Sequence, residues 1–259
     1  MTYIKKEIQG QVGIICFNND DKRNSLNLEL LEEFKAAFEE FEQQKLRAII
    51  LRSNPGAKVW SAGLAINELP EPGKDPLPFN HPLELLMRKV EDFPAPVIGM
   101  IEGSVWGGAC DLAFTCDILI GSPKCSFAIT PAKIGVPYNA TGLSHFLNFV
   151  EMNIAKEMFF TAKPIDADRA YNLGIINHLI DVEELEEFTF KMAKGITYNS
   201  PLAISIIKKQ LNLLGRARPM NPEVYEQITS LRRDAYSSQD FLEGRNAFLE
   251  KRKPVFKGE

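Results

Sequence analysis

The adjacent glycines Gly107 and Gly108 constrain the fold most, because they join two apolar segments of different character. The run Val97–Ile101 before them is typical of a buried strand, and Ala109–Thr115 after them of a short buried helix. The first amides of a helix have no intrahelical acceptor, and glycines lack a Cβ atom, so another molecule can approach this backbone closely. The turn can therefore form half of an oxyanion hole, or its glycines can simply permit tight packing of the helix on the strand.

The N-terminal segment predicts a parallel sheet. Strands are expected at Tyr3–Glu7 and Val12–Phe17, joined by a hairpin. Apolar residues then recur every three or four positions from Leu30 to Phe41, which indicates an amphipathic helix, and Ala48–Leu51 follows as a buried strand. Since neighbouring parallel strands need a crossover connection, the strand–helix–strand order favours an α/β fold.

The rest of the chain passes from mixed structure to mostly helical structure. A long loop rich in proline and glycine follows Ser53 and extends to Pro82, and a second such connection covers Thr130–Gly142. The other elements expected are strands at 117–121, 125–129 and 175–180, and helices at 82–92, 153–160, 166–172, 183–196, 202–214, 222–237 and 240–253.

The composition argues against several classes of protein. The formal net charge of −4 disfavours a general nucleic-acid-binding protein, which needs a basic surface to replace phosphate counterions. The N-terminus shows no signal peptide, and no apolar run is long enough to span a bilayer. We therefore expect a cytoplasmic protein that binds neither nucleic acid nor membrane.

Metal and nucleotide-cofactor sites lack their usual motifs. The four cysteines stand in apolar contexts without CxxC spacing, which predicts free thiols, and the histidines His81, His145 and His178 stand singly. Neither a GxxxxGK[ST] loop nor a GxGxxG fingerprint is present. We expect no metal and no cofactor.

Three segments together resemble the crotonase (enoyl-CoA hydratase/isomerase) superfamily. They are WSAGLAI from Trp60 to Ile66, the glycine turn VWGGACDLAFTCD and the basic C-terminal segment AFLEKRKPVF, in the order typical of this family. The resemblance covers essentially the whole chain. It implies an α/β fold with a crotonase-like ββα spiral core, residues 1–200, that holds an acyl-CoA site. It also implies a helical C-terminal trimerisation region, residues 201–259, and a homotrimer or homohexamer.

The resemblance further implies how an acyl-CoA substrate is held. The two oxyanion donors are the backbone N–H groups of Leu64 and Gly108, and two preorganised donors of this kind stabilise a thioester enolate by roughly several kcal/mol. The backbone around Ala62, Leu64 and Ile66 is expected to recognise the adenine. Gly107 belongs to the same turn as Gly108 and is expected to contact the substrate.

The lysines Lys22, Lys251 and Lys253 are the residues that the resemblance offers for the phosphates of coenzyme A. A phosphate needs positive charge rather than a fixed geometry from lysine, so the neighbouring Arg23 or Arg252 can serve instead. The alternative for all five is ordinary solvated surface charge, and at a helix C-terminus basic residues also favour the helix dipole.

The acyl pocket departs from the family pattern at one position. The SAG turn is commonly followed by one residue and then Asp, whereas Leu64-Ala65 follows here, and a related decarboxylase of the superfamily has His at position 64. The backbone N–H of residue 64 is still present as a donor, but the change leaves the preferred acyl group undetermined. Trp106 packs against the acyl pocket or the core rather than doing chemistry, since indole offers one donor and no useful base.

Hydration of an enoyl thioester requires two carboxylates that position and deprotonate a water. The hydratases of the superfamily have Glu at the positions matching Asp111 and Ala132, so only one acid, shorter by a methylene, remains here. Alanine cannot relay a proton, and efficient hydration or isomerisation is therefore disfavoured. The role of Asp111 stays open, because a negative charge beside a substrate carboxylate is unhelpful unless it is turned away, protonated or fixed by a partner.

Decarboxylation requires fewer catalytic groups than hydration does. Carbon dioxide leaves once the enolate is stabilised and the carboxylate is held out of the thioester plane, so a hydrogen-bond donor in an apolar site suffices. Tyr138, in GVPYN, occupies the family position of that orienting group, although it can also be an ordinary core tyrosine. Asn139, Thr130 and Thr141 are secondary candidates.

The segments EGSVWGGA, TPAKIGVPYN, SLRRDAYSSQDFLEG and NAFLEKRKP look most like those of the superfamily's methylmalonyl-CoA-decarboxylating members. We therefore expect a cofactor-independent carboxy-lyase that converts methylmalonyl-CoA, or a close malonyl-type thioester, to propionyl-CoA and carbon dioxide. The alternatives are a hydratase/isomerase-like enzyme acting on another acyl-CoA, and a catalytically inactive acyl-CoA-binding homologue.

Overall fold

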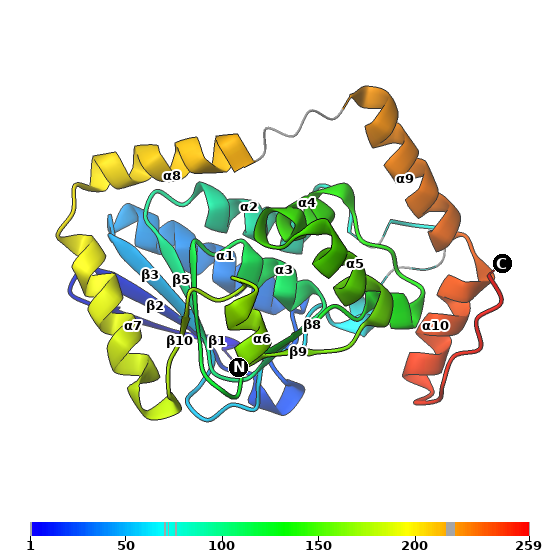
Figure 1. Cartoon of the computed structure of the whole chain (residues 1–259), viewed down its shortest axis with the longest axis horizontal. Helices are drawn as coiled ribbons and strands as arrows, with labels where there is room; N and C mark the ends of the chain where they lie inside the picture. The colour runs from blue at the N-terminus through cyan, green and yellow to red at the C-terminus, as the bar shows by residue number, and fades with distance from the viewer. Residues whose placement is uncertain (1, 70, 72, 76, 216–220, 259) are drawn as a thin grey trace.

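The computed structural model describes residues 2–69, 71, 73–75, 77–215 and 221–258 (Figure 1). Its strands are β1 (Ile4–Gln9), β2 (Val12–Phe17), β3 (Ala48–Arg52), β4 (Val59–Ser61), β5 (Val97–Ile101), β6 (Ser104–Trp106), β7 (Ile118–Gly121), β8 (Ser126–Ala128), β9 (Ile165–Asp166) and β10 (His178–Leu179). Its α-helices are α1 (Leu28–Gln43), α2 (Pro82–Asp92), α3 (Gly108–Phe114), α4 (Ala140–Phe149), α5 (Met152–Thr161), α6 (Ala167–Asn172), α7 (Val182–Thr197), α8 (Pro201–Gly215), α9 (Pro222–Tyr236) and α10 (Gln239–Leu249). Short 3-10 helices are η1 (Asp20–Lys22), η2 (Ile66–Glu68) and η3 (Pro131–Ile134).

From β3 to β8, consecutive strands alternate between two sheets. The described strands form a six-stranded sheet in the order β1-β2-β3-β5-β7-β10 and a four-stranded sheet in the order β4-β6-β8-β9. The chain runs β3, β4, α2, then β5, β6, α3, then β7, β8, η3 and α4, so each turn adds one strand to each sheet before a helical segment. This repetition is the ββα spiral that the sequence predicts.

The large sheet is parallel except at its N-terminal edge. β1 and β2 form an antiparallel hairpin, whereas β2–β3, β3–β5, β5–β7 and β7–β10 pair in parallel. Successive side chains of a strand point to opposite faces. Ile49 and Leu51 of β3 accordingly join the core beneath α1, α2 and α3, while Ala48 and Ile50 join a second cluster against α7. The inner strands β3 and β5 are thus buried on both faces, as their unbroken apolar sequences predict, whereas the edge strand β1 is mostly exposed.

Helix α1 follows the predicted amphipathic pattern. The side chain of Asn27 accepts a hydrogen bond of 2.9 Å from the amide of Leu30, which caps the helix at its start. The buried face is Leu30, Leu31, Phe34, Ala37, Phe38 and Phe41. Every one of these residues lies on the apolar stripe read from the sequence.

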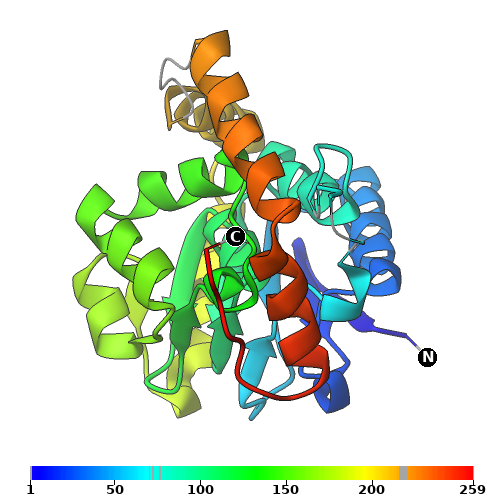
Figure 2. The same cartoon turned by 90° about the vertical axis from the view of Figure 1, so that its right-hand side faces the viewer.

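The three C-terminal helices lie outside the spiral. Figure 1 shows α8 along one edge of the molecule and α9 with α10 at another, and Figure 2 shows α9 projecting beyond the rest. Lys208 attaches α8 to the core, because its buried ammonium donates to the carbonyls of Val90 and Ala95 and pairs with Asp117 at 2.7 Å. Helix α10 packs closely on η3, where a Cβ atom at Gly244 would lie 2.4 Å from the backbone of Ile134.

Several predicted boundaries were wrong. The strand expected at 175–180 is only His178–Leu179, since Ile175 and Ile176 bend from a left-handed Gly174 and bond to the carbonyl of Ala170. The last helix ends at Leu249 rather than at 253, and Lys251 has φ 56°. The long loop after Ser53 contains β4 and η2, which its proline and glycine content obscured, and residues 70, 72 and 76 of that loop lie outside the described residues.

Candidate active site

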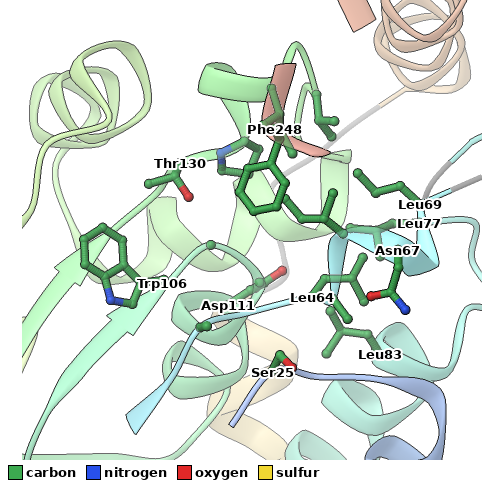
Figure 3. A pocket seen from close by; sticks show the side chains of 18 of the residues that line it. Ser25, Leu64, Asn67, Leu69, Leu77, Leu83, Trp106, Asp111, Thr130 and Phe248 are labelled. Atoms are coloured by element: carbon green, nitrogen blue, oxygen red, sulfur yellow. The ribbon is translucent and has the colours of Figure 1, made fainter. Parts of the chain in front are cut away.

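A largely apolar cavity of about 600 Å³ opens between the turn after β4, the glycine turn before α3, η3 and α10. Leu64 and its apolar neighbours gather on one side of it, Trp106 lies on the other, and Phe248 reaches in from α10 (Figure 3). Much of the wall consists of aliphatic side chains, namely Leu64, Ile66, Leu69, Leu77, Leu83, Ile134 and Val136. Such a pocket suits an apolar acyl group and excludes much of the surrounding water.

Two backbone amides converge on this cavity. A Cβ atom built on Gly108 would lie 3.6 Å from the amide nitrogen of Leu64, and both residues border the cavity. Leu26 bonds to the residues on either side of Leu64: its N–H donates to the carbonyl of Gly63, and its carbonyl accepts from the N–H of Ala65. The N–H of Leu64 therefore points away from Leu26. Gly108 is the first residue of α3 and has no intrahelical acceptor. Within the described part of the chain, neither amide donates to a protein acceptor, which leaves both for an oxygen atom of a ligand.

Two glycines with positive φ make this convergence possible. Gly63 has φ 82°, and a Cβ atom there would lie 2.4 Å from the carbonyl oxygen of Trp106. Gly107 has φ 52° and ψ −124°, a region that side chains with a Cβ atom rarely adopt. The SAG turn and the WGG turn therefore touch backbone to backbone. The sequence pattern contains both glycines, although the close packing of Gly63 was not foreseen.

Tyr138 borders the cavity and is buried, with 7% of its surface exposed. Its ring packs edge-on against Phe146 and Phe159, and its hydroxyl donates a hydrogen bond of 2.9 Å to the carbonyl of Gly107. Burial, with smaller contributions from neighbouring negative groups, holds the pKa of the Tyr138 phenol well above its usual value. The hydroxyl is thus a neutral hydrogen-bond donor and not a base.

A chain of buried charged groups lies behind the cavity floor. Oδ1 of Asp111 is 2.6 Å from Nδ1 of His145, and Nε2 of His145 is 3.4 Å from Oε1 of Glu91. Burial lowers the pKa of His145, but the hydrogen bonds and charges of Asp111 and Glu91 outweigh it and raise the pKa to about 10. His145 is therefore an imidazolium at neutral pH. The partner that Asp111 needs is this histidine, which sequence spacing gave no means of finding.

The secondary candidates differ in their access to the cavity. The Thr130 hydroxyl borders it and has no protein partner among the described residues. Asn139 does not border it, because its amide donates to the buried Glu84 and its carbonyl oxygen accepts 2.6 Å from the amide of Gly142. Burial, partly offset by this bond from Asn139, raises the pKa of Glu84. Thr141 is exposed and does not border the cavity.

The other predicted site residues divide between the cavity and the surface. Ala62, Ile66, Trp106 and Gly107 border the cavity together with Arg23. The indole N–H of Trp106 donates 2.8 Å to Ser104, in keeping with a packing role.

The predicted lysines lie at the surface. Lys22, Lys251 and Lys253 are exposed and do not border the cavity, although Leu249 of the preceding helix does. Arg252 is occupied, since it pairs with Glu243 and Glu250 at the surface.

Ala132, where hydratases carry a second acid, lies exposed on η3 next to cavity residues Thr130 and Pro131. The four cysteines are free. In the part of the chain that is described, no group of three or more His, Cys, Asp or Glu side chains could hold a metal ion. None of the described helices combines the length and apolar character needed to cross a membrane.

Two solved structures resemble this chain over its entire length. "Methylmalonyl-CoA decarboxylase in complex with 2-nitronate-propionyl-CoA" matches with a TM-score of 0.98 and 43% identity, covering 100% of this chain and 99% of that chain. Methylmalonyl-CoA decarboxylase complexed with 2S-carboxypropyl CoA matches with a TM-score of 0.97, the same identity and the same coverage. The crotonase-like fold with a helical C-terminal region, expected from the sequence, is thereby confirmed.

Sequence comparisons agree with the structural ones. The chain is 44% identical to methylmalonyl-CoA decarboxylase of Escherichia coli (strain K12) over 256 residues, which cover 99% of this chain and 98% of that protein. It is 28% identical to the short-chain-enoyl-CoA hydratase of Clostridium acetobutylicum, over 95% of this chain and 94% of that protein. The sequence profile of the enoyl-CoA hydratase/isomerase family matches residues 7–259. This chain therefore belongs to the enoyl-CoA hydratase/isomerase family.

Proposed function

We propose that this chain is a carboxy-lyase that converts methylmalonyl-CoA to propionyl-CoA and carbon dioxide. Its 44% identity over nearly the whole length to a methylmalonyl-CoA decarboxylase supports this reaction. So do the matches to decarboxylase structures that contain 2-nitronate-propionyl-CoA and 2S-carboxypropyl CoA. The observation that carries the proposal is the pair of backbone amides, Leu64 and Gly108, which border one apolar cavity and donate to no acceptor among the described residues.

The two amides stabilise the charge that develops during the reaction. When the bond between the α-carbon and the carboxylate breaks, its electron pair moves into the thioester and forms an enolate, while carbon dioxide leaves. Negative charge then concentrates on the thioester oxygen, until the α-carbon takes up a proton and propionyl-CoA is formed. The N–H groups of Leu64 and Gly108 are fixed by the backbone before the reaction starts, so they need no reorganisation to bind this oxygen.

Tyr138 and Thr130 are the hydroxyl groups that can orient the substrate carboxylate. Both border the cavity, and the Thr130 hydroxyl has no other partner among the described residues. The Tyr138 hydroxyl has a single hydrogen, which now bonds to the carbonyl of Gly107. Donation to a substrate carboxylate therefore requires that Tyr138 release Gly107. This exchange is possible without moving the buried ring, because only the O–H torsion has to change.

Hydration is the less favoured reaction. Ala132 cannot act as a second acid, and the single carboxylate of Asp111 is engaged by His145 at 2.6 Å. A water in this cavity would lack the pair of carboxylates that position and deprotonate it. An inactive acyl-CoA-binding role is disfavoured because the oxyanion donors remain in place.

The test is a comparison of three thioesters with the purified full-length protein. Methylmalonyl-CoA, malonyl-CoA and crotonyl-CoA are incubated separately, and carbon dioxide release and thioester mass are followed. Propionyl-CoA formed from methylmalonyl-CoA is the expected result. Hydration of crotonyl-CoA alone would show that water is activated after all, by Asp111 alone or by another group. Tight binding of all three without turnover would establish the inactive binding protein.

The phosphate contacts predicted for coenzyme A, Lys22, Lys251 and Lys253, belong to this proposal. Arg23 borders the cavity and Lys22 precedes it, while Lys251 and Lys253 follow shortly after Leu249, which also borders the cavity. Positive charge is thus close in sequence to two of the segments that line the cavity, which favours these residues as contacts for the phosphates of a bound coenzyme A. Adenine recognition by the backbone around Ala62 and Ile66 belongs to the same proposal, since both residues border the cavity.

A homotrimer or homohexamer is the assembly that the family resemblance implies. Support comes from the exposed apolar residues of α8, which are Leu202, Ile206, Ile207, Leu211, Leu213 and Leu214. Surfaces of this kind are usually covered by another protein chain. Size-exclusion chromatography with light scattering checks this directly, and a monomer at micromolar concentration would exclude both assemblies.

A cytoplasmic location is part of the same proposal. The four cysteines are free and three of them are buried, which suits a reducing compartment. Fractionation of cells that express the protein, with immunodetection of each fraction, tests it.

A further inference from the structure

The hydrogen-bonded charged residues Asp111, His145 and Glu91 take no part in the decarboxylation proposed for this protein. They come from three helices, since Glu91 belongs to α2, Asp111 to α3 and His145 to α4. The side chains of Asp111 and His145 are only 4% and 9% exposed, so neither charge is screened well by water. Burying such groups is costly unless they are paired. The pairing with His145 therefore offsets much of the cost of burying the Asp111 carboxylate.

Asp111 is the member of this group that meets the cavity. It borders the cavity beside Gly108, and Figure 3 places it between Trp106 and Leu64. A Cβ atom built on Gly142 would lie 2.9 Å from Oδ2 of Asp111 and 2.7 Å from the ring of Tyr138. The second oxygen of Asp111 and the ring of Tyr138, the residue proposed to orient the substrate carboxylate, thus both pack against Gly142.

An unneutralised Asp111 would repel a carboxylate on the acyl group. Two like charges a few ångströms apart in a site of low dielectric interact strongly, and the second buried acid of α2, Glu84, adds to the negative side. The only positive group in contact with Asp111 among the described residues is His145. The Arg88 guanidinium is more distant and pairs weakly with Glu84, at 4.0 Å.

We propose that the imidazolium of His145 neutralises Asp111 and holds its carboxylate in place, so that the cavity accepts an acyl group that itself bears a carboxylate. His145 is a positioning residue that acts on the substrate through Asp111 and sets a preference for carboxylated over neutral acyl groups. The inference rests on the proposed function for the identity of the substrate. It concerns binding, so it can be tested apart from turnover.

The experiment compares the dissociation constants of two ligands. One is 2S-carboxypropyl-CoA, which bears a carboxylate, and the other is propionyl-CoA, which does not. In His145→Gln, the ratio of the first constant to the second should rise about tenfold or more. In the double variant His145→Gln/Asp111→Asn, the ratio should return to within about threefold of wild type, because the uncompensated charge has been removed.

His178→Gln is the matched control. His178 lies on β10 against Phe188 and outside the cavity, so the same substitution there should leave the ratio unchanged. If His145→Gln does not fold, the Asp111→Asn variant alone tests the direction in which the ratio of dissociation constants changes. It removes a negative charge and keeps His145, so the ratio should not rise.

Three results would overturn the inference. They are an unchanged ratio in His145→Gln, an equal loss of affinity for both ligands that Asp111→Asn does not reverse, and a rise of the ratio in Asp111→Asn alone. Turnover of methylmalonyl-CoA by the wild-type protein is measured in parallel. Absence of that turnover with the predicted change in the ratio would reject the proposed reaction and leave the charge-neutralising role of His145 standing.

Discussion

The site has two parts, one made of backbone groups and the other of side chains. The donor wall, defined as the amides of Leu64 and Gly108, is backbone and depends on the glycines Gly63 and Gly107 for its shape. The charge wall, defined as Asp111, which borders the cavity, together with His145 and Glu91 behind it, is made entirely of side chains.

Because of this difference, stabilisation of the enolate and preference for an acyl group depend on different residues. The donor wall keeps its N–H with any residue other than proline at position 64, so leucine can stand there without loss of the donor. The charge wall changes with each substitution. Enolate stabilisation can therefore be retained across a family whose reactions and acyl groups diverge.

Removing a donor should have the largest effect. Gly108→Pro eliminates one oxyanion N–H at the first position of α3, where proline is compatible with a helix. Turnover of methylmalonyl-CoA should fall by about 10²–10³-fold or more. Circular dichroism establishes that the variant is folded.

Gly108→Ala is the control for this substitution. It keeps the N–H and adds a Cβ atom 3.2 Å from Leu83, so it should retain much more activity than the proline variant. A folded Gly108→Pro with turnover near wild type would remove the donor wall from the mechanism.

Tyr138→Phe tests a side chain that joins the two walls. The variant keeps the packing against Phe146 and Phe159 but loses the hydroxyl that bonds to Gly107. We expect kcat to fall by about 10–100-fold, the size associated with loss of one orienting or proton-handling group. Affinity for propionyl-CoA should change little.

Tyr236→Phe is the matched control, since Tyr236 is another buried tyrosine whose hydroxyl bonds to a backbone carbonyl, that of Pro137, and it does not border the cavity. Equal kcat values for the Tyr138 variant and the wild type would show that Thr130, or another group, orients the carboxylate.

The charge wall should also give stability a dependence on pH. The pKa of His145 is about 10 in the folded protein, against about 6.5 for an unperturbed histidine. A raised folded pKa means that the stabilisation is complete below about pH 6.5 and is lost as the pH rises toward 10.

Urea unfolding of wild type and His145→Gln at pH 6, 8 and 10 measures this effect. The difference in unfolding free energy should be on the order of a few kcal/mol at pH 6 and should shrink steadily above that pH. A difference that stays constant over the whole range would indicate that His145 is not charged in the folded protein.

The sequence predicts the donor wall better than the charge wall, for a physical reason. Gly107 and Gly108 lie between two apolar segments, so the local sequence locates the turn. Asp111 and His145 are separated by 34 positions and Lys208 and Asp117 by 91, and no local pattern links them. The strands β4 and β6 have only three residues each, too few to show an alternation. Long-range pairing and short strands are decided by tertiary packing, which composition and spacing do not encode.

The smallest expected effect concerns the surface lysines, which belong to neither wall. Lys22 and Lys253 are exposed, so each phosphate contact competes with water and salt and should be worth about 0.2–1 kcal/mol. Lys22→Ala and Lys253→Ala should therefore weaken propionyl-CoA binding by only about 1.5–5-fold each, and less at high salt. Lys163→Ala, at an exposed position that does not border the cavity, is the control. The decisive comparison is with propionyl-pantetheine, which lacks the nucleotide phosphates. If either lysine variant weakened binding of that ligand as much as binding of propionyl-CoA, the lysine would be acting on the cavity itself, and the separation between a backbone site for the acyl group and a surface site for the phosphates would fail.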